Sequence, residues 1–387
     1  MPKSDLYIGV LSGTSADSID ALLVDFSNSI EVIDRFSKKI PKAVKNKIFE
    51  LVLNKKITKY AKRQTELDDI LGELIGKSVN QLIKRTKIDK QMVKAIGSHG
   101  QTIKHSSSRK NPFSLQIGNP ELVRKLTGIK VVYGFRQSDI ANGGMGAPLT
   151  PAFHNEYMSQ AKVNRAIVNI GGITNVTLLP AKGKVLGWDI GPGNCLIDQA
   201  MKNITNGKKQ FDNKGFLAKK GNPHVLKNTI KKFLNESYFK RPIPKSQTVE
   251  NYDLRKFKFD PLEIKKLKDE DLISGLTEIT FQSILRDLKK YCNKKYEIYF
   301  CGGGTKNNYL MDRFNELHIE NLQFFKTSDL GIDPLDVEAM TFAWLAKKRL
   351  EKQKIKLTSV TGSKPCLMGE VINLSLIHIS EPTRRSY

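Results

Sequence analysis

The chain has 387 residues, 39% of them hydrophobic, which is enough for about two domains that each bury a core. It has no apolar run of membrane-spanning length and no signal-peptide pattern at its start, and its four cysteines lack the spacing of metal ligands, so we expect a cytoplasmic protein with reduced thiols and no membrane partner. The net charge of +25 comes from lysines spread along the chain rather than from a basic tract interleaved with aromatic residues, so we expect no nucleic-acid partner.

The first predicted element is a hairpin at residues 6–26, in which two apolar strands flank a hydroxyl-rich loop. Gly13 lets the loop backbone approach a ligand closely, and Thr14 with its neighbouring amides can donate to phosphate oxygens. Asp17 is a candidate ligand for a hydrated magnesium ion. The loop residues that we expect to bind a nucleotide are Ser12, Gly13, Thr14, Ser15, Asp17 and Asp20. An ordinary hairpin with a polar turn would contain the same residue types, so the loop alone leaves both interpretations open.

Helices and strands alternate in the next hundred residues. Residues 41–53 and 58–85 have helical periodicity, and residues 94–98, 113–117 and 130–133 have the apolar character of buried strands. This alternation predicts an α/β fold.

The strand-loop-strand pattern is repeated halfway along the chain. Residues 164–170 and 176–179 are apolar strands, and the glycine-hydroxyl turn 171–175 joins them. Each copy of the hairpin is followed by a further extended segment, at residues 30–36 and 184–190. A duplicated three-strand unit predicts two similar lobes, which would hold a nucleotide between their two hairpins.

Three further glycine clusters accompany this second hairpin, at residues 142–148, 189–194 and 299–307. The last two follow strands and open predicted helices, so a nucleotide lying there would meet a helix N-terminus, which favours negative charge. A glycine-rich turn is usually no more than a turn, but several at strand ends favour a ligand site. The residues that we expect to bind the nucleotide from this half are Gly171, Gly172, Asn175, Gly191, Gly193, Asn194, Gly302, Gly303 and Gly304.

The remaining segments add two helices and one irregular region. Residues 273–291 and 334–350 are predicted amphipathic helices. Residues 211–259 are polar and contain several prolines, so we expect a mobile flap or a surface excursion there.

Taken together, these motifs resemble the anhydro-N-acetylmuramic acid kinase family. The motifs occur in the family's order, at residues 13–17, 98–102, 134–141, 144–149, 169–173, 189–194 and 301–304. The chain departs from the family pattern at Ala16 and Ser18, where methionine and glycine are usual, and at Met145, where glutamine is usual.

The resemblance implies a fold of two RNase H-like lobes, as in actin-like ATPases and sugar kinases, with a nucleotide cleft between them. On this basis we assign residues 1–130 and about 350–373 to lobe I and residues 131–349 to lobe II. Residues 374–387 have no counterpart in the family, and we expect them to be a foreign or disordered tail.

The resemblance also implies the reaction. The family uses ATP and Mg²⁺ to open the 1,6-anhydro ring of 1,6-anhydro-N-acetylmuramic acid with water and to phosphorylate O6, which serves cell-wall recycling. By the family's pattern Asp189 is the general base, and Glu338 is a candidate second carboxylate. Asp189 could instead cap a helix, and Glu338 could be a solvent-facing helix residue. A homodimer is a family expectation.

The resemblance also gives a set of candidate substrate residues: His99, Gln101, Arg136, Asp139 and Gly146. His99 could instead be structural, as a lone histidine after a strand often is. Arg136 is expected either to pair with Asp139 or to bind the lactyl carboxylate of the sugar in a bidentate manner.

Two other classes remain open. Another actin-fold ATPase, such as a hydroxyl-directed sugar kinase, would share the two hairpins and residues 302–304 but would not need residues 135–148. A basic RNase H-like nucleic-acid enzyme would need three or four clustered acids on strands and salt-dependent binding.

Overall fold

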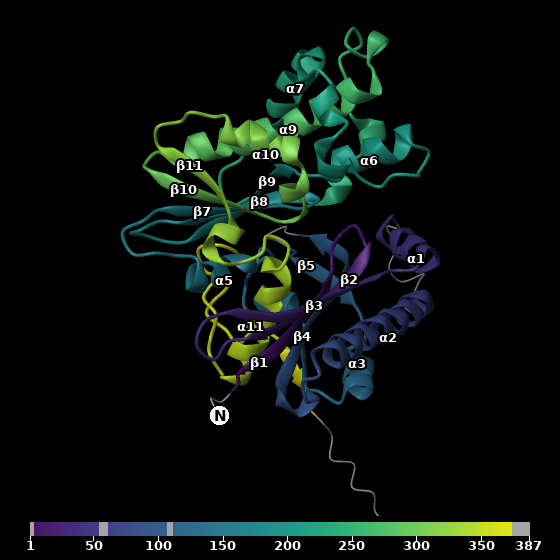
Figure 1. The fold of residues 1–387 in the computed structure, drawn as a ribbon, viewed down its shortest axis with the longest axis vertical. Coiled ribbons are helices and arrows are strands. Elements are labelled where there is room, and N and C mark those ends of the chain that lie inside the picture. Colours follow the sequence, from purple (N-terminus) through teal and green to yellow (C-terminus); the bar gives the residue numbers. More distant parts are fainter. Residues whose placement is uncertain (1–3, 54–60, 107–110, 374–387) are drawn as a thin grey trace, which may run out of the picture.

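The computed structural model describes residues 4–53, 61–106 and 111–373, which form two β-sheets with helices packed on them (Figure 1). The tail expected at residues 374–387 and the start of the helix predicted at 58–85 lie outside the described residues. None of the helices within the described ranges combines the length and the apolar character that crossing a membrane requires.

The first sheet has seven strands in the order β12-β6-β4-β1-β2-β3, with β5 paired to β4. Its strands are β1 (Leu6–Ser12), β2 (Ser18–Asp25), β3 (Glu31–Lys39), β4 (Val93–Ser106), β5 (Phe113–Ile117), β6 (Val131–Tyr133) and β12 (Glu370–Ile372). The predicted first hairpin is confirmed, because β1 and β2 pair antiparallel with Val10 opposite Ala21.

The second sheet has five strands in the order β11-β10-β7-β8-β9. Its strands are β7 (Arg165–Ile170), β8 (Ile173–Leu179), β9 (Leu186–Pro192), β10 (Tyr296–Cys301) and β11 (Leu322–Lys326). The second predicted hairpin is also confirmed, with Val168 of β7 opposite Val176 of β8.

The two sheets share one strand order. In each sheet three consecutive antiparallel strands form a meander, β1-β2-β3 and β7-β8-β9, and the next long strand, β4 or β10, pairs parallel with the first strand of the meander. Parallel pairing requires a crossover connection, and helices lie in both crossovers. The expected α/β class and the duplicated three-strand unit are therefore confirmed.

Eleven α-helices lie within the described ranges. They are α1 (Lys42–Leu53), α2 (Ala61–Thr86), α3 (Pro120–Thr127), α4 (Phe135–Ala141), α5 (Thr150–Tyr157), α6 (Cys195–Ile204), α7 (Lys227–Leu234), α8 (Ser237–Lys240), α9 (Asp269–Tyr291), α10 (Asn308–Asn315) and α11 (Val337–Leu350). Helix α2 packs on β2 and β3 of the first sheet, whereas α9 packs on β9 of the second (Figure 1).

Helix α11 lies directly on the first sheet, against β1 and β4. Two glycines make this close approach possible: a Cβ added at Gly9 would clash with the carbonyl oxygen of Ala339, and one at Gly97 would clash with that of Phe342. The absence of two side chains therefore sets the distance between α11 and the sheet, and with it the position of Glu338 in the first turn of the helix.

We expect Gly9→Ala to destabilise the protein by about 1–3 kcal/mol, the usual effect of inserting a group into a well-packed core. The added methyl group must displace the backbone of α11, which cannot yield as a flexible side chain could. Thermal unfolding of the variant measures the effect. Gly13→Ala is the matched control, because no described atom outside its immediate chain neighbours lies within 4 Å of a Cβ added there. Equal melting temperatures for the two variants would contradict this account.

Sheet membership corrects the lobe boundaries that we assigned from the sequence. Strand β6 and helix α11 fall within the residues assigned to lobe II, but β6 belongs to the first sheet and α11 packs on it. The chain thus returns to the first lobe before residue 350, and we propose that lobe I includes α11 and the segment that follows it.

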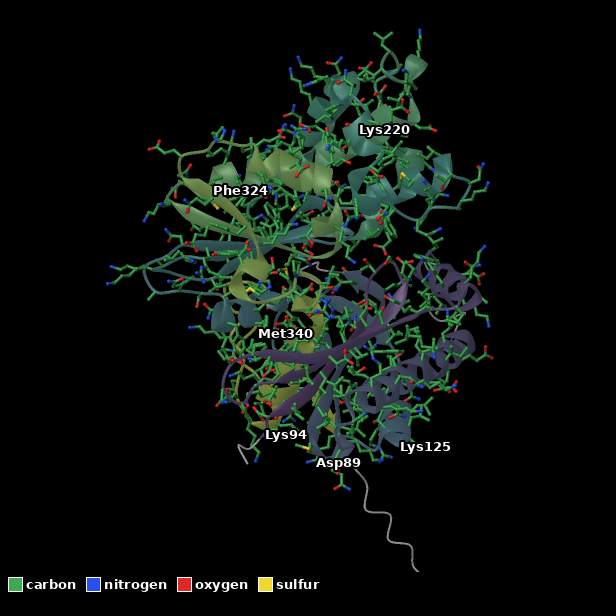
Figure 2. The ribbon with its side chains drawn as sticks, in the orientation of Figure 1. Asp89, Lys94, Lys125, Lys220, Phe324 and Met340 are labelled. Atoms are coloured by element: carbon green, nitrogen blue, oxygen red, sulfur yellow. The ribbon has the colours of Figure 1, made fainter. Side chains whose placement is uncertain are left out.

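The two lobes share an apolar core. One buried cluster joins Tyr7 and Leu22 of the first sheet to Ile167 and Tyr299 of the second, and α11 contributes Met340 to it. Met340 lies near the centre of the molecule, between the two sheets (Figure 2). Helix α5 contacts both α11 and β8, so it also connects the lobes.

The region expected as a mobile flap or surface excursion is packed instead. Within residues 211–259, Phe233, Phe239 and Tyr252 are buried and form a cluster with α6 and α9. Aromatic side chains of this size bury enough apolar area to hold an irregular segment in place. The buried aromatic residues of the segment therefore outweigh its prolines and polar residues.

Candidate active site

The turn of the second hairpin is bound to the turn that precedes α6. The backbone N–H of Gly193 donates to Gly172 O at 2.9 Å, and that of Asn194 donates to Gly171 O at 2.8 Å. A Cβ at Gly193 would clash with the carbonyl oxygen of Gly171. The two predicted nucleotide-binding turns, 171–175 and 191–194, therefore form one surface next to the N-terminus of α6.

The third glycine cluster joins the same surface. Gly302 follows β10 with a positive φ of 84°, and a Cβ there would clash with the side chain of Asn169 at the end of β7. Gly303 has no described atom within 4 Å of an added Cβ outside its chain neighbours, so its backbone faces open space. The predicted helix after this cluster begins with a 3₁₀ turn, Gly303–Lys306, and continues as α10.

The hairpin turns of the two lobes face each other. A Cβ added at Gly172 would lie 3.3 Å from Thr14 Oγ1, although the two residues come from different sheets. Thr14 and Ser15 are exposed. The structure thus brings together the two loops that the repeat had predicted to meet.

Two of the predicted ligand contacts are occupied within the protein. Ser12 and Gln101 are buried, and Ser12 Oγ donates to Gln101 Oε1 at 2.7 Å. Neither side chain is available to a ligand in this arrangement, contrary to the expectation that Ser12 binds nucleotide and Gln101 binds substrate. The pair fastens the end of β1 to β4 and so fixes where the first loop begins.

The carboxylates of the first hairpin differ in their surroundings. Asp17 is exposed and forms an ion pair with Lys45 of α1, whereas both oxygens of Asp20 accept from Ser18 Oγ, at 3.0 and 3.1 Å. Burial, with a smaller contribution from Asp17, raises the pKa of Asp198 on α6 to about 7, while Lys202 and Lys45 oppose the rise. The first hairpin therefore lies within electrostatic range of α6 in the other lobe.

Asp189 occupies a polar niche on β9. Its Oδ2 accepts from Ser246 Oγ at 2.8 Å and from the backbone N–H of Gln247 at 2.9 Å. Burial raises the pKa of Asp189 to about 6, although these hydrogen bonds and the cations of Arg136 and Lys245 favour the charged form. The N-cap residue of α6 is Asn194, so Asp189 is not a helix cap. A carboxylate with this pKa is suited to general-base work near neutral pH.

Arg136 lies within electrostatic range of Asp189, from the first turn of α4. Its Nε donates to His99 Nε2 at 2.8 Å, and its Nη1 donates to Gly146 O at 2.9 Å. His99 Nδ1 is 3.2 Å from Gly100 O, so the ring is neutral with its proton on Nδ1. Burial and the Arg136 cation hold the pKa of His99 well below its usual value. His99 and Gly146 thus fix the guanidinium, which keeps Nη2 for a ligand.

Asp139 does not form an ion pair with Arg136 among the described residues. It is fully buried, and its carboxylate accepts from the backbone N–H of Gly146 at 2.7 Å and from Thr361 Oγ1 at 2.8 Å. The expected direct contact between Asp139 and substrate does not fit this burial. Asp139 instead holds the glycine-rich loop 142–148 against the segment after α11.

Glu338 has no hydrogen bond or ion pair within the part of the chain that the structure describes. Water can reach its side chain, yet the surrounding protein raises its pKa, Arg136 opposes the rise and Asp20 adds to it. Glu338 is thus exposed, as the solvent-facing alternative expects, but Arg136 and Asp20 both act on its carboxylate. The charges of Glu338 and Asp189 both act on Arg136, and the charge of Asp20 acts on Glu338. These four residues therefore lie within electrostatic range of one another's neighbours, where the two lobes meet.

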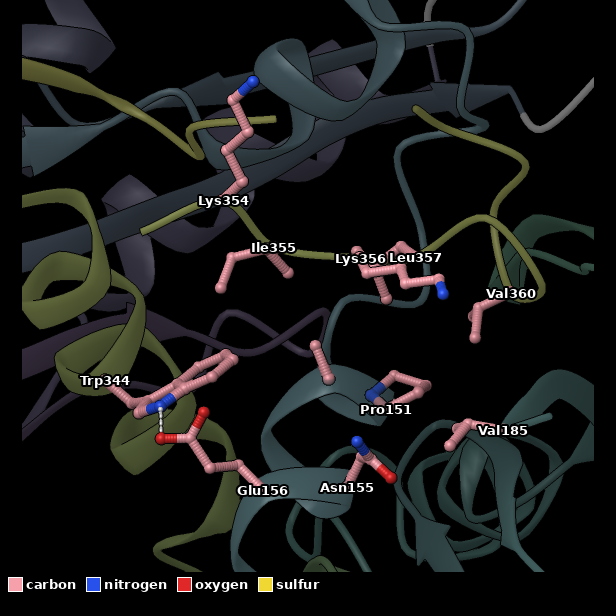
Figure 3. A pocket seen from close by; sticks show the side chains of 11 residues that line it. Pro151, Asn155, Glu156, Val185, Trp344, Lys354, Ile355, Lys356, Leu357 and Val360 are labelled. Carbon is pink, nitrogen blue, oxygen red and sulfur yellow. Dashed lines mark hydrogen bonds between the residues drawn. The ribbon is translucent and has the colours of Figure 1, made fainter. Parts of the chain in front are cut away.

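Two cavities lie apart from these residues. One of about 240 Å³ lies between α5, the second half of α11 and residues 354–360, where Trp344 Nε1 donates to Glu156 Oε1 at 3.0 Å (Figure 3). Another of about 680 Å³ is lined by Tyr7, by the start of β4 and by residues 128–130, which precede β6. We place the candidate site at the facing hairpins because the polar and glycine-rich elements meet there.

Comparison with known proteins gives a consistent result. The family model described as anhydro-N-acetylmuramic acid kinase matches residues 5–373. The chain belongs to this family. An anhydro-N-acetylmuramic acid kinase of Coxiella burnetii (strain RSA 493 / Nine Mile phase I) is 38% identical over 366 residues, which cover 94% of this chain and 96% of that protein. One of Shewanella denitrificans is 38% identical over 372 residues, covering 95% of this chain and 98% of that protein.

Among solved structures, the ethanolamine utilization protein EutJ from Carboxydothermus hydrogenoformans aligns with 89% of this chain and 90% of its own. Its sequence identity is 12% and the TM-score is 0.39, which is too low to support an inference.

The family motifs led to Asp189 and Arg136 but not to their supporting residues. Tyr238, Ser246 and Gln247 all hydrogen-bond to Asp189, and all three lie in the segment expected to be an excursion. The sequence signal that could have found them is the aromatic pair Tyr238-Phe239, which is buried.

Proposed function

We propose that the chain is an ATP-dependent kinase that opens the 1,6-anhydro ring of 1,6-anhydro-N-acetylmuramic acid with water and phosphorylates O6, giving N-acetylmuramic acid 6-phosphate and ADP. One observation carries the proposal beyond family membership. Asp189 is a carboxylate with a pKa of about 6, it lies within electrostatic range of Arg136, and it is on the strand that leads into the 191–194 turn beside the facing hairpins.

The substrate explains why a base is needed. O6 belongs to the internal ether and carries no proton, so water must attack the anomeric carbon. As the new C1–O bond forms, the C1–O6 electron pair moves to O6, O6 bonds to the γ-phosphorus, and the bond from phosphorus to ADP breaks. The attacking water loses its proton to Asp189. Arg136 offers Nη2 to the carboxylate of the lactyl group.

The glycine loops suit the triphosphate. Gly13, Thr14, Gly172 and Gly303 present backbone and one hydroxyl without bulky side chains, and the N-terminus of α6 favours negative charge nearby. A bound Mg²⁺ would supply positive charge that offsets the negative charge developing during phosphoryl transfer. Glu338 and Asp20 would hold it, because Mg²⁺ takes one or two carboxylates and fills its shell with water and phosphate.

Enzyme assay tests the function directly. ADP release should require the anhydro sugar, and in ¹⁸O-labelled water the label should enter at C1 of the product. N-acetylmuramic acid, which has a free O6 hydroxyl, is the matched comparison. Faster turnover of the plain sugar, without label at C1, would support the hydroxyl-directed sugar kinase and contradict the anhydro-sugar reaction.

We propose that Asp17 supports the Mg²⁺ site through the water around the ion rather than as a direct ligand, so Asp17→Ala is expected to weaken the apparent affinity for Mg²⁺ by about 10–100-fold, typical for groups around a metal. Asp17 is exposed on the first hairpin and paired only with Lys45 among the described residues, so the fold should survive. Turnover across a Mg²⁺ titration measures the effect. Asp89→Ala, at the far end of the first lobe (Figure 2), is the control. Wild-type turnover at limiting Mg²⁺ would exclude this role.

We also propose a homodimer, from family resemblance, and a cytoplasmic location, from the cysteine pattern of the sequence. Light scattering after size-exclusion chromatography tests the oligomeric state. Salt-dependent binding of a single-stranded oligonucleotide would favour the nucleic-acid enzyme instead.

A further inference from the structure

One short segment holds Asp189 at four points. Ser246 Oγ and the Gln247 N–H both donate to Oδ2, as described above. The N–H of Asp189 donates to Lys245 O at 3.0 Å, and Tyr238 Oη donates to Asp189 O at 2.7 Å. Backbone and side chain of Asp189 are thus both fixed by residues 238–247. No donor from the described residues reaches Oδ1.

A buried ion pair anchors this segment to α9. Asp287 Oδ2 accepts from Trp188 Nε1 at 2.8 Å and lies 3.6 Å from Lys245 Nζ. The side chains of Lys245 and Asp287 are only 3% and 2% exposed. Lys245 Nζ also lies 4.8 Å from the centre of the Tyr238 ring, within cation–π range.

The position of these partners in the chain is informative. Ser246 donates a hydrogen bond to Asp189, and the residues that precede these two in the chain are Lys245 and Trp188. Asp287 binds both Lys245 and Trp188, so it holds the chain on each side of that hydrogen bond. Desolvating two charges is costly, and a buried ion pair seldom adds net stability. The Lys245–Asp287 ion pair is better explained if it positions Ser246 against Asp189.

We propose that Ser246, Lys245 and Asp287 are positioning residues that hold Oδ2 of Asp189 and leave Oδ1 to take the proton of the attacking water. This inference rests on the proposed function, because it assigns the geometry of the base in that reaction. Ser246 and Gln247 donate to the charged form of the carboxylate.

The electrostatic surroundings fix the direction of the expected effect. The charged groups that act on Asp189 are Arg136 from α4 and Lys245 from the segment, while Tyr238 and Tyr252 approach as neutral phenols. Removing the Ser246 hydroxyl withdraws a hydrogen bond from the anion. The pKa of Asp189 must then rise, and the low-pH limb of the kcat/KM profile must move to higher pH.

Ser246→Ala tests the inference. We expect kcat to fall about tenfold and the low-pH limb to move up by about one pH unit, the effect of losing one hydrogen bond to a charged group. KM for ATP and the melting temperature should stay unchanged. Ser246→Thr, which keeps the hydroxyl, should restore both readouts. Ser78→Ala is the control, since it removes a buried hydroxyl on α2 that donates only to Leu74 O among the described residues.

Lys245→Met is the second variant. It should lower kcat and move the low-pH limb of the kcat/KM profile to higher pH, because the Lys245 cation favours the charged form of Asp189. It also leaves Asp287 buried without its cation, so its melting temperature should fall; if it does not fold, Ser246→Ala decides. A Ser246→Ala enzyme with wild-type kcat and pH profile would overturn the inference, and so would a lower kcat with an unshifted profile. Failure of the wild-type enzyme to turn over the anhydro sugar would instead contradict the proposed function.

Discussion

Asp189→Asn should lower kcat by about 10²–10⁴-fold, the usual contribution of a general base. Asparagine keeps the size of the side chain and an oxygen that can accept from Ser246 and Gln247, but it cannot take a proton from water. The nucleotide is expected to bind through the glycine loops, so its affinity should change little and the loss should appear in kcat. Single-turnover kinetics in ¹⁸O-labelled water measure it. A near-normal rate with label at C1 would exclude Asp189 as the base.

The pH dependence of the wild-type enzyme follows from the same residue. Asp189 must be ionised to act, and its pKa is about 6 because burial disfavours the anion. Activity should therefore fall as the pH drops below about 6, and the Asp189→Asn variant should lack this limb. Rates for both enzymes between pH 5 and 8 make the comparison.

Stability should respond in the opposite sense. The folded pKa of Asp189 lies above the value of 3.8 for an unperturbed aspartate, so the folded state binds the proton more tightly than the unfolded state. By linkage, Asp189 costs stability as the pH rises through the window from about 4 to about 6, and the full cost remains at neutral pH. Asparagine carries no such cost. An increase in melting temperature for Asp189→Asn at pH 7 would fit this account, and a decrease would contradict it.

The sequence predicted the elements whose signals are local. Continuous apolar runs and glycine turns were sufficient to find both hairpins, the repeat and the loops at residues 171–175 and 191–194. What it could not supply were contacts between distant residues. Ser246 meets Asp189 across 57 positions, and Ser12 meets Gln101 across 89, and neither pair has a sequence spacing that marks it.

The lobe boundary was missed for a related reason. Helix α11 follows elements of the second lobe in the chain, so the order of elements placed it there. Its packing depends instead on Gly9 and Gly97, whose missing side chains open the surface of the first sheet to a helix backbone. A glycine inside an apolar strand is a signal of such close approach. This packing also brings Glu338 within electrostatic range of Asp20, a residue of the first sheet.

Glu338→Gln is the second substitution with a large expected effect. Among the described residues Glu338 has no hydrogen-bonding partner, and it lies within electrostatic range of Arg136 and Asp20. Its side chain is exposed, and the nearby Asp20 charge disfavours its ionised form, so a cation that reaches both carboxylates would relieve the repulsion between them. Glutamine has nearly the same shape but no charge, so it should weaken the apparent affinity for Mg²⁺ by at least about 10–100-fold and lower kcat at limiting metal.

A Mg²⁺ titration of turnover separates this role from others. If Glu338 holds the metal, excess Mg²⁺ should restore part of the rate, and binding of ATP without metal should be unaffected. Glu351→Gln is the matched control, because Glu351 lies just after the same helix and forms its ion pair with Lys347. A rate that stays low at every Mg²⁺ concentration would place Glu338 in proton transfer instead, and an unchanged rate at limiting Mg²⁺ would exclude both roles. The charge of Glu338 also attracts Arg136, but His99 and Gly146 O hold the Arg136 guanidinium through hydrogen bonds. If these two hydrogen bonds are sufficient to position Arg136, Glu338→Gln should change the KM for the anhydro sugar less than it changes the apparent affinity for Mg²⁺.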